Sequence, residues 1–345
     1  GWDEGFGGNS ERSRVRVSVL APLGLGLGLG LGLGLVLGSG PGLSAMHGVS
    51  RAAWKSRTEE ELAKRAAKAK QYKALEAALQ DVRRRGDNSD AAVDLGAQLL
   101  RVNPDAYSAW NHRREMLFAR TTAAAGETEG GGAGGAWELA ADVAAGELRL
   151  TAEALRRQPK SYPAWHHRRW VLERLAGDRE TAFAEELRLC AVFLDADERN
   201  FHCWNHRRWA AAVAGVTPEE NLAYTQDRLD VNFSNYSAFH ERSQVLPRLE
   251  AYREDPLAVL AEELMLVQNI TVTEPEDQSA WWYYRFLLAA LLQVEAEDGV
   301  KLTALRGEQQ NLRDLLELET DCKWALVMLA HIHTHTAGLE NAEAA

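Results

Sequence analysis

The chain has 345 residues, of which 46% are hydrophobic, so it is long enough to bury one large core or two ordinary ones. Asp and Glu outnumber Lys and Arg by 50 to 39, which gives a formal charge of −11. A net acidic chain is a poor general binder of nucleic acid, because that affinity comes mainly from neutralising phosphates. The three cysteines show no close metal-ligand spacing, which favours free buried thiols in a reducing compartment. We therefore predict a cytoplasmic protein.

Residues 1–45 have the outline of a secretory signal, with three arginines and then an apolar stretch from Val17 to Leu37. This stretch is mostly an alternating Gly-Leu tract, however, and glycine costs about 1 kcal/mol per helix position relative to alanine. The chain begins with Gly1, and its first methionine is Met46. We predict that Met46 is the natural start and that residues 1–45 are a non-native or disordered leader.

The next elements are a helix and a loop. A charged, alanine-rich stretch without proline or glycine runs from Thr58 to Arg85, and it predicts one long amphipathic helix that ends at Gly86. Further on, residues 121–136 are rich in Ala, Gly and Thr, which predicts a flexible surface loop.

A signature of the form Tyr-x-x-Trp-x-His-Arg-Arg then recurs along the chain. Clear copies lie at 107–114 and 162–169, and a third, with Phe in place of Tyr, lies at 201–208. Weaker copies lie at 235–242 and 277–285, and a remnant lies at 321–324. Successive aromatic anchors are 55, 39, 35, 42 and 43 residues apart. Self-similarity at such a period is typical of repeat proteins.

Each interval also holds a second helical pattern ahead of the next signature. These patterns cover Glu147–Arg157, Glu180–Leu194, Pro218–Leu229, Leu257–Val267 and Lys301–Leu318. The third of them has a strong start signal, because Thr217 is followed by Pro218 and, three residues after the threonine, by Glu220. Helix–turn–helix units bury a continuous core only when stacked. We predict an all-α fold over residues 46–330, a right-handed α-α superhelix built as a solenoid of helical hairpins.

The chemistry of the signature favours a structural role. On a helix, Tyr162, Trp165, Arg168 and Arg169 share one stripe. The tryptophan is expected to be a buried anchor, and the arginines to reach carboxylates or carbonyls of the neighbouring hairpin. A motif repeated several times cannot be a separate catalytic site each time. We therefore assign structural roles to Trp110, Arg113, Trp165, Arg168, Trp204, Arg207 and Trp281.

Function is expected where the copies differ. Lys160 and His202 stand near the starts of signature helices in adjacent hairpins. A lysine and a histidine beside helix N-termini make a site for an anionic group, because the donors and the dipole there favour negative charge. On spacing alone, a solvated lysine and a capping histidine remain the alternative.

The repeat resembles that of protein prenyltransferase α subunits, over a region from Met46 to Trp324. Within that family, the blocks that begin at Glu198, Asn232 and Asp277 resemble the Rab geranylgeranyltransferase (type II) α subunit more than the α subunit of farnesyltransferase and type I geranylgeranyltransferase. The resemblance implies a subunit, inactive alone, that pairs with a catalytic β subunit holding Zn²⁺ and the lipid. It implies transfer of geranylgeranyl from its diphosphate to C-terminal cysteines of Rab GTPases that an escort protein presents.

The resemblance also implies site residues. Lys160 falls on the family's lysine that reaches the isoprenoid diphosphate, and Tyr162, His202 and Asn200 fall on positions lining the same site. A positioned cation there would stabilise charge on the leaving group. No metal or cofactor is expected on this chain alone, nor any nucleic acid partner or membrane span. His47 is a weaker candidate, as a regulatory ligand to the β-subunit zinc; the alternative is a disordered terminal histidine.

The last part of the chain departs from the repeat. The sixth copy lacks its Arg-Arg, and alternating histidines follow Ala330. On a helix His331 and His335 would share a face, but we prefer an atypical, disordered tail at 331–345 to a metal site. Two other functions stay open: the α subunit of farnesyltransferase and type I geranylgeranyltransferase, and a non-catalytic helical scaffold that binds peptides.

Overall fold

The computed structural model describes residues 58–126 and 137–343. The predicted leader, His47 and residues 127–136 lie outside the described residues. The chain divides into two compact units, Gly1–Leu62 and Ala63–Ala345, and the second contains all the helices except the first residues of α2. The helices are α2 (Glu59–Arg85), α3 (Asp90–Val102), α4 (Tyr107–Gly126), α5 (Ala141–Arg157), α6 (Tyr162–Glu173), α7 (Arg179–Ala196), α8 (Phe201–Ala214), α9 (Pro218–Val231), α10 (Tyr236–Val245), η1 (Leu246–Arg248), α11 (Glu250–Glu254), α12 (Pro256–Thr273), α13 (Gln278–Gln293), α14 (Asp298–Leu318) and α15 (Lys323–Glu343).

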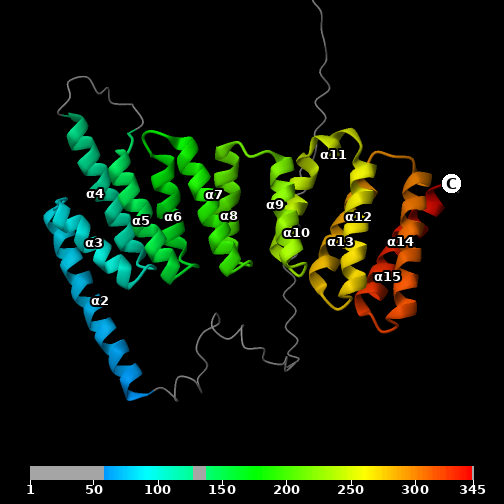
Figure 1. Cartoon of the computed structure of the whole chain (residues 1–345), viewed down its shortest axis with the longest axis horizontal. Helices are drawn as coiled ribbons and strands as arrows, with labels where there is room; N and C mark the ends of the chain where they lie inside the picture. The colour runs from blue at the N-terminus through cyan, green and yellow to red at the C-terminus, as the bar shows by residue number, and fades with distance from the viewer. Residues whose placement is uncertain (1–57, 127–136, 344–345) are drawn as a thin grey trace, which may run out of the picture. The chain divides into compact units, whose positions relative to one another are not determined.

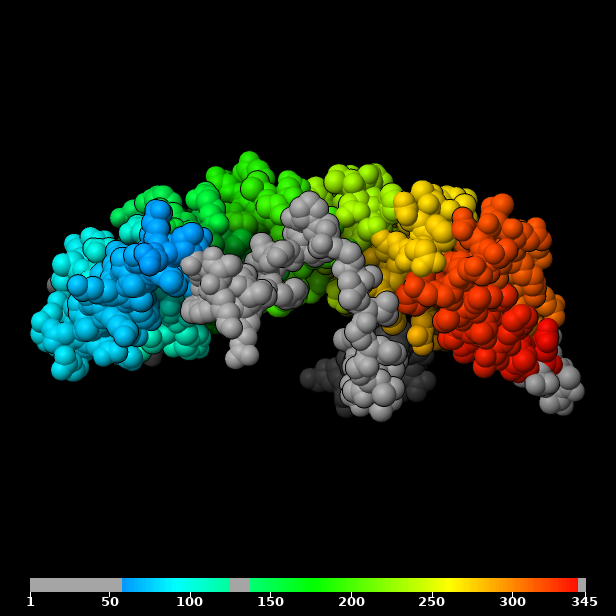
Figure 2. All heavy atoms as spheres, turned by 90° about the horizontal axis from the view of Figure 1, so that it is seen from below, coloured from blue at the N-terminus to red at the C-terminus, as the bar shows by residue number. Residues whose placement is uncertain are grey.

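Six antiparallel hairpins follow one another within the second unit (Figure 1). They are α3/α4, α5/α6, α7/α8, α9/α10, α12/α13 and α14/α15, and Figure 2 shows the same succession from below. Among the described residues the β structure is one isolated bridge, between Leu139 and Leu175. The predicted all-α solenoid of helical hairpins is confirmed, and each signature forms the second helix of its hairpin. No helix of the described part is both long and apolar enough to cross a membrane.

Every hairpin has the same four-residue turn between its two helices, at 103–106, 158–161, 197–200, 232–235, 274–277 and 319–322. The fourth turn residue starts the signature helix: Asn200 accepts hydrogen bonds from the backbone N–H groups of His202 and Cys203, and Asn235 accepts one from Ala238. Side chains at the start of a helix stabilise it by satisfying such N–H groups. The capping box predicted at Thr217 and Glu220 is present.

Hydrogen bonds also tie each turn to its neighbours. The Ser161 hydroxyl donates to the Pro104 carbonyl (2.9 Å), the Asn200 amide to Pro159 (3.0 Å) and the Ser279 hydroxyl to Ser234 (3.0 Å). The signature tryptophans are buried, and the Nε1 of each donates to a carbonyl six residues earlier, for Trp110, Trp165, Trp204 and Trp281. Hydrogen bonds thus run along this edge of the solenoid, which we call the turn edge.

The buried apolar core falls into two main clusters. The N-terminal core runs from Leu79 of α2 to Trp204 of α8, and the C-terminal core from Leu229 of α9 to Ile332 of α15. The partly buried Tyr224 of α9 packs against the N-terminal core. The boundary between the two cores thus lies at the contact between the α7/α8 and α9/α10 hairpins.

Three sequence predictions need correction. Residues 121–126 of the predicted loop belong to α4, and the tail predicted to be disordered is helical as far as Glu343, where α15 ends. His331 and His335 do share a face of α15, with ring centroids 4.7 Å apart. The helix predicted to be amphipathic throughout has an apolar face only in its second half, because residues 58–71 are exposed and the buried positions are Leu79 and Val82.

Candidate functional site

A buried ion pair joins successive hairpins. Arg113 of α4 binds Glu147 of α5 through two hydrogen bonds (2.6 and 2.7 Å). The same geometry recurs between Arg168 of α6 and Glu186 of α7 (Nε–Oε1 2.7 Å, Nη2–Oε2 2.6 Å), and between Arg242 of α10 and Glu263 of α12 (2.6 and 2.7 Å). Bidentate arginine–carboxylate pairs are strong and fix orientation. Arg113, Arg168 and Arg242 therefore each link their hairpin to the next one.

A third residue completes each of these joints from the glutamate's own hairpin, twenty residues later. His167 contacts Glu147 (2.9 Å), His206 contacts Glu186 (2.6 Å), and the Tyr283 hydroxyl donates to Glu263 (2.6 Å). Burial raises the pKa of Glu147 and Glu186, but the hydrogen bonds and charges of their arginine and histidine partners outweigh it and bring each pKa to about 2. Burial lowers the pKa of His167 to about 4, so this imidazole is neutral at pH 7.

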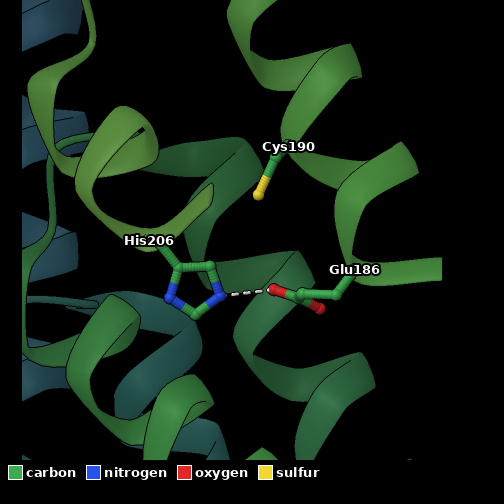
Figure 3. A group of neighbouring side chains, drawn as sticks. All are labelled: Glu186, Cys190 and His206. Atoms are coloured by element: carbon green, nitrogen blue, oxygen red, sulfur yellow. Dashed lines mark hydrogen bonds and ion pairs between the residues drawn. The ribbon is translucent and has the colours of Figure 1, made fainter. Parts of the chain in front are cut away.

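One joint has the donor types of a metal site, since Glu186, Cys190 and His206 converge in the core (Figure 3). The carboxylate is already engaged, however, because Arg168 and His206 both hold it. The hydrogen bond with Cys203 and burial raise the pKa of Cys190 well above its usual value, which keeps the thiol protonated, whereas a metal binds the thiolate. The positions equivalent to Cys190 in other joints hold Thr151 and Val267. The donor chemistry thus fits a variant of the structural joint.

The joint between α7/α8 and α9/α10 departs from the pattern. Asn221 stands where the first helices α5, α7 and α12 have glutamate, and Glu241 stands where the second helices α4, α6, α8 and α13 have His or Tyr. Arg207 donates to Asn221 (2.9 Å), and the described residues place no carboxylate within ion-pair distance of it. Glu241 is bound by the neighbouring arginine, Arg208, and not by Arg207 (3.0 and 2.6 Å). Arg207 is therefore buried and reaches the next hairpin, but through a side-chain amide oxygen and not through a carboxylate.

The predicted site residues lie together on the turn edge. Lys160 is in the α5–α6 turn, Tyr162 begins α6, and His202 is the second residue of α8. Asn200 brings them together through both atoms of its side-chain amide. Its oxygen accepts a hydrogen bond from the backbone N–H of His202 at the start of α8, and its nitrogen donates to the carbonyl of Pro159, next to Lys160. The Tyr162 and His202 ring centroids are 6.2 Å apart. The two adjacent hairpins thus place a cation, a phenol and an imidazole at one point.

The electrostatics of this cluster suit an anion. The Lys160 ammonium lies 3.4 Å from a carboxylate oxygen of Asp197, and its side chain keeps 39% of its accessible surface. Burial, and then the charge of Lys160, lower the pKa of His202, so its imidazole is neutral at pH 7 and has one N–H to donate. Tyr162 is exposed. The cluster therefore offers one cation and neutral donors to a ligand.

Asn200 does not fit the direct contact predicted for it. Its side chain is fully buried, and both its amide and its carbonyl are used within the protein. We assign it a positioning role. Sequence reasoning also missed Asp197 and the joint glutamates. The sequence does carry a signal for the glutamates, because each lies twenty residues before its partner in the signature helix. The pairs are Glu147 and His167, Glu186 and His206, and Glu263 and Tyr283.

The chain is similar to known proteins. The family model described as the protein prenyltransferase alpha subunit repeat matches residues 90–120, 144–175, 183–212 and 260–291, which are four of the hairpins. The mouse geranylgeranyl transferase type-2 subunit alpha is 44% identical over 252 residues, which are 70% of this chain and 42% of the mouse protein. The human protein is 43% identical over the same length. The chain thus spans about two fifths of the length of these mammalian relatives.

A relative from Dictyostelium discoideum matches along nearly its whole length. This geranylgeranyl transferase type-2 subunit alpha is 33% identical over 308 residues, which cover 86% of this chain and 92% of that protein. The match includes the hairpins on both sides of the Lys160 cluster. The chain belongs to the family of geranylgeranyl transferase type-2 alpha subunits.

Proposed function

We propose that this chain is the α subunit of a Rab geranylgeranyltransferase, which transfers geranylgeranyl from geranylgeranyl diphosphate to C-terminal cysteines of Rab GTPases that an escort protein presents. The observation that carries the proposal is the meeting of Lys160, Tyr162 and His202 on the turn edge of a chain in this family. The names of the relatives, geranylgeranyl transferase type-2 subunit alpha, support the transferase type.

Within this function, the chain's own residues stabilise the leaving group. Breaking the bond between an allylic carbon and a diphosphate concentrates negative charge on the diphosphate, and a preorganised cation favours that change. Lys160 supplies the cation, while His202 and Tyr162 supply neutral donors. A zinc ion held by the β subunit would supply the Lewis acid that favours the thiolate form of the acceptor cysteine.

A β-subunit partner is supported by the surface as well as by the family. The first residue of four successive signature helices is an exposed aromatic, with 49–60% of its surface accessible: Tyr107, Tyr162, Phe201 and Tyr236. These rings follow the turn edge beside Lys160. Exposed apolar groups that gather along one edge mark interaction surfaces. We place the β subunit there, in a cytoplasmic heterodimer that is inactive as separate chains.

Co-expression with a type II β subunit tests the proposal. The expected result is a stable pair that transfers geranylgeranyl to a Rab GTPase only when escort protein is present, with neither subunit active alone. Preference for farnesyl diphosphate without need of escort protein would instead show the farnesyltransferase type. Recovery of unrelated peptide clients and no β subunit would show a scaffold.

A further inference from the structure

Asp197 holds a charge that its local structure does not require. It follows α7 as the first residue of the α7–α8 turn, and its Oδ1 accepts a hydrogen bond from the backbone N–H of Arg199 (3.2 Å). The equivalent turn residues Asn103 and Asn232 accept the same bond, from Asp105 (3.1 Å) and Ser234 (2.9 Å). An asparagine therefore forms this turn equally well, and the negative charge needs another explanation.

The second oxygen of Asp197 faces the candidate site. Oδ2 is buried and makes no hydrogen bond within the described residues, yet it lies 3.4 Å from the Nζ of Lys160. The Asp197 side chain keeps 20% of its accessible surface and is fixed by its turn, whereas a lysine side chain is long and flexible. The fixed carboxylate thus restrains the movable ammonium, across the contact between two hairpins.

We propose that Asp197 is a positioning residue, which holds the Lys160 ammonium beside His202 and thereby tunes how an isoprenoid diphosphate binds and reacts. This inference rests on the proposed function. The restraint helps catalysis, because a cation that is already in place needs no reorganisation as charge develops on the leaving group. The same carboxylate weakens binding of the intact diphosphate, because like charges repel.

The two effects act on different kinetic constants. Replacing Asp197 by Asn keeps the turn but removes the charge, so the diphosphate is expected to bind more tightly while the Lys160 ammonium becomes less well placed. We expect kcat to fall and KM for geranylgeranyl diphosphate to fall with it, each about two- to fivefold, the scale of a partly exposed ion pair. A purely structural turn residue would change neither constant.

The experiment measures steady-state kinetics of the complete heterodimer with Rab and escort protein, for the wild type and Asp197→Asn, Lys160→Ala and the double variant. Asp195→Asn is the matched control, since Asp195 is an exposed carboxylate near the same helix end that pairs with Arg228 and not with Lys160. We expect Asp195→Asn to match the wild type. The effect of Asp197→Asn on kcat should vanish in the Lys160→Ala background, because in positioning the cation the two residues act as one unit. Its effect on KM should remain, because the repulsion between the carboxylate and the diphosphate does not pass through Lys160.

Two failures are distinguishable. Absence of geranylgeranyl transfer by the wild-type pair overturns the proposed function. An active wild type, impaired by Lys160→Ala but unchanged in kcat and KM by Asp197→Asn, leaves the proposed function standing and overturns the role of Asp197. An equal fall in kcat on Asp197→Asn with and without Lys160 overturns it as well.

Discussion

The guanidinium carbon of Arg207 lies 3.5 Å from the centroid of the Tyr224 ring. The equivalent arginines of three other hairpins, Arg113, Arg168 and Arg242, each bind a glutamate instead. A buried cation over an aromatic face is stabilised by the ring quadrupole. The contact between Arg207 and Tyr224 does not fix the two hairpins to each other as a bidentate ion pair does. The division between the two apolar cores falls at this same contact. The α8–α9 contact is thus a distinct type of joint within one solenoid.

We predict that the helices on the two sides of this joint open separately. Native-state hydrogen exchange in increasing urea should give one opening free energy for α5–α8 and another for α12–α15, because local stability follows buried apolar contacts. Restoring the common joint with Asn221→Glu and Glu241→His together should bring the two values closer. A single shared opening free energy in the wild-type chain would contradict this prediction.

Removing one joint carboxylate should be costly. Glu186→Gln leaves Arg168 buried without a carboxylate, and breaking a buried ion pair from one side costs about 3–5 kcal/mol. Glu185→Gln is the control, because Glu185 is exposed on the same helix. The free energies of unfolding in urea check the difference, and equal values for the two variants would show that the joint adds nothing to stability.

Acid should destabilise the chain in two ranges. His167 has a pKa of about 4 in the folded chain against 6.5 as an ordinary histidine, so between these values the unfolded chain binds a proton that the folded one does not. Glu147 and Glu186 act likewise from pH 4.5 down to about 2. Each group lowers the free energy of unfolding by about 1.4 kcal/mol per pH unit within its range as pH falls.

Urea titrations at several pH values check this dependence. Glu186→Gln should flatten the decline below pH 4.5, because one of the two buried joint carboxyls whose pKa is about 2 is gone, and leave the His167 range nearly unchanged. A decline below pH 4.5 as steep as in the wild type would mean that Glu186 does not titrate in that range.

The Glu186–Cys190–His206 cluster should not depend on a metal. We expect a chelator to leave the melting temperature unchanged, and Cys190→Thr, which copies the residue at the Thr151 position, to shift the free energy of unfolding by less than about 2 kcal/mol. Calorimetry and elemental analysis provide the measurements. Stoichiometric zinc in the wild type that disappears in Cys190→Thr would show a metal site after all.

Lys160→Ala should lower turnover of the heterodimer by about 100- to 1000-fold, the range for losing a group that stabilises developing charge. The matched control is Lys323→Ala, because Lys323 lies beside the α14–α15 turn and pairs with Glu276 (3.3 Å), far along the chain from the site. Pull-down of the β subunit separates assembly from catalysis. Equal turnover in the two variants would remove Lys160 from the mechanism.

The repeat made most of the fold predictable. Trp110, Trp165, Trp204 and Trp281 recur with the same neighbours, so the hairpins and their buried anchors follow from spacing. The exceptions have physical reasons. Residues 331–343 are helical because the buried Met328 and Ile332 of α15 pack on the C-terminal core, a tertiary contact that a local pattern of histidines and alanines does not reveal.

The candidate site was less predictable than the fold. Lys160 and His202 come together because Asn200 binds the carbonyl of Pro159, and such a side-chain link between hairpins leaves no mark in the spacing of either one. The same holds for Asp197, whose turn role is visible in the sequence while its distance to Lys160 is not. Lys160 itself was found by resemblance and by its difference from the other copies.

The four-residue turns have a consequence for where this chain tolerates change in length. All six are the same length and are tied to each other by hydrogen bonds, so an added residue would shift every hairpin beyond it along the row. On the opposite edge, the connections between hairpins range from three residues (215–217) to fourteen (127–140). A fluorescent label, tag or inserted domain therefore belongs on that opposite edge, where it would leave the spacing between Lys160 and α8 intact.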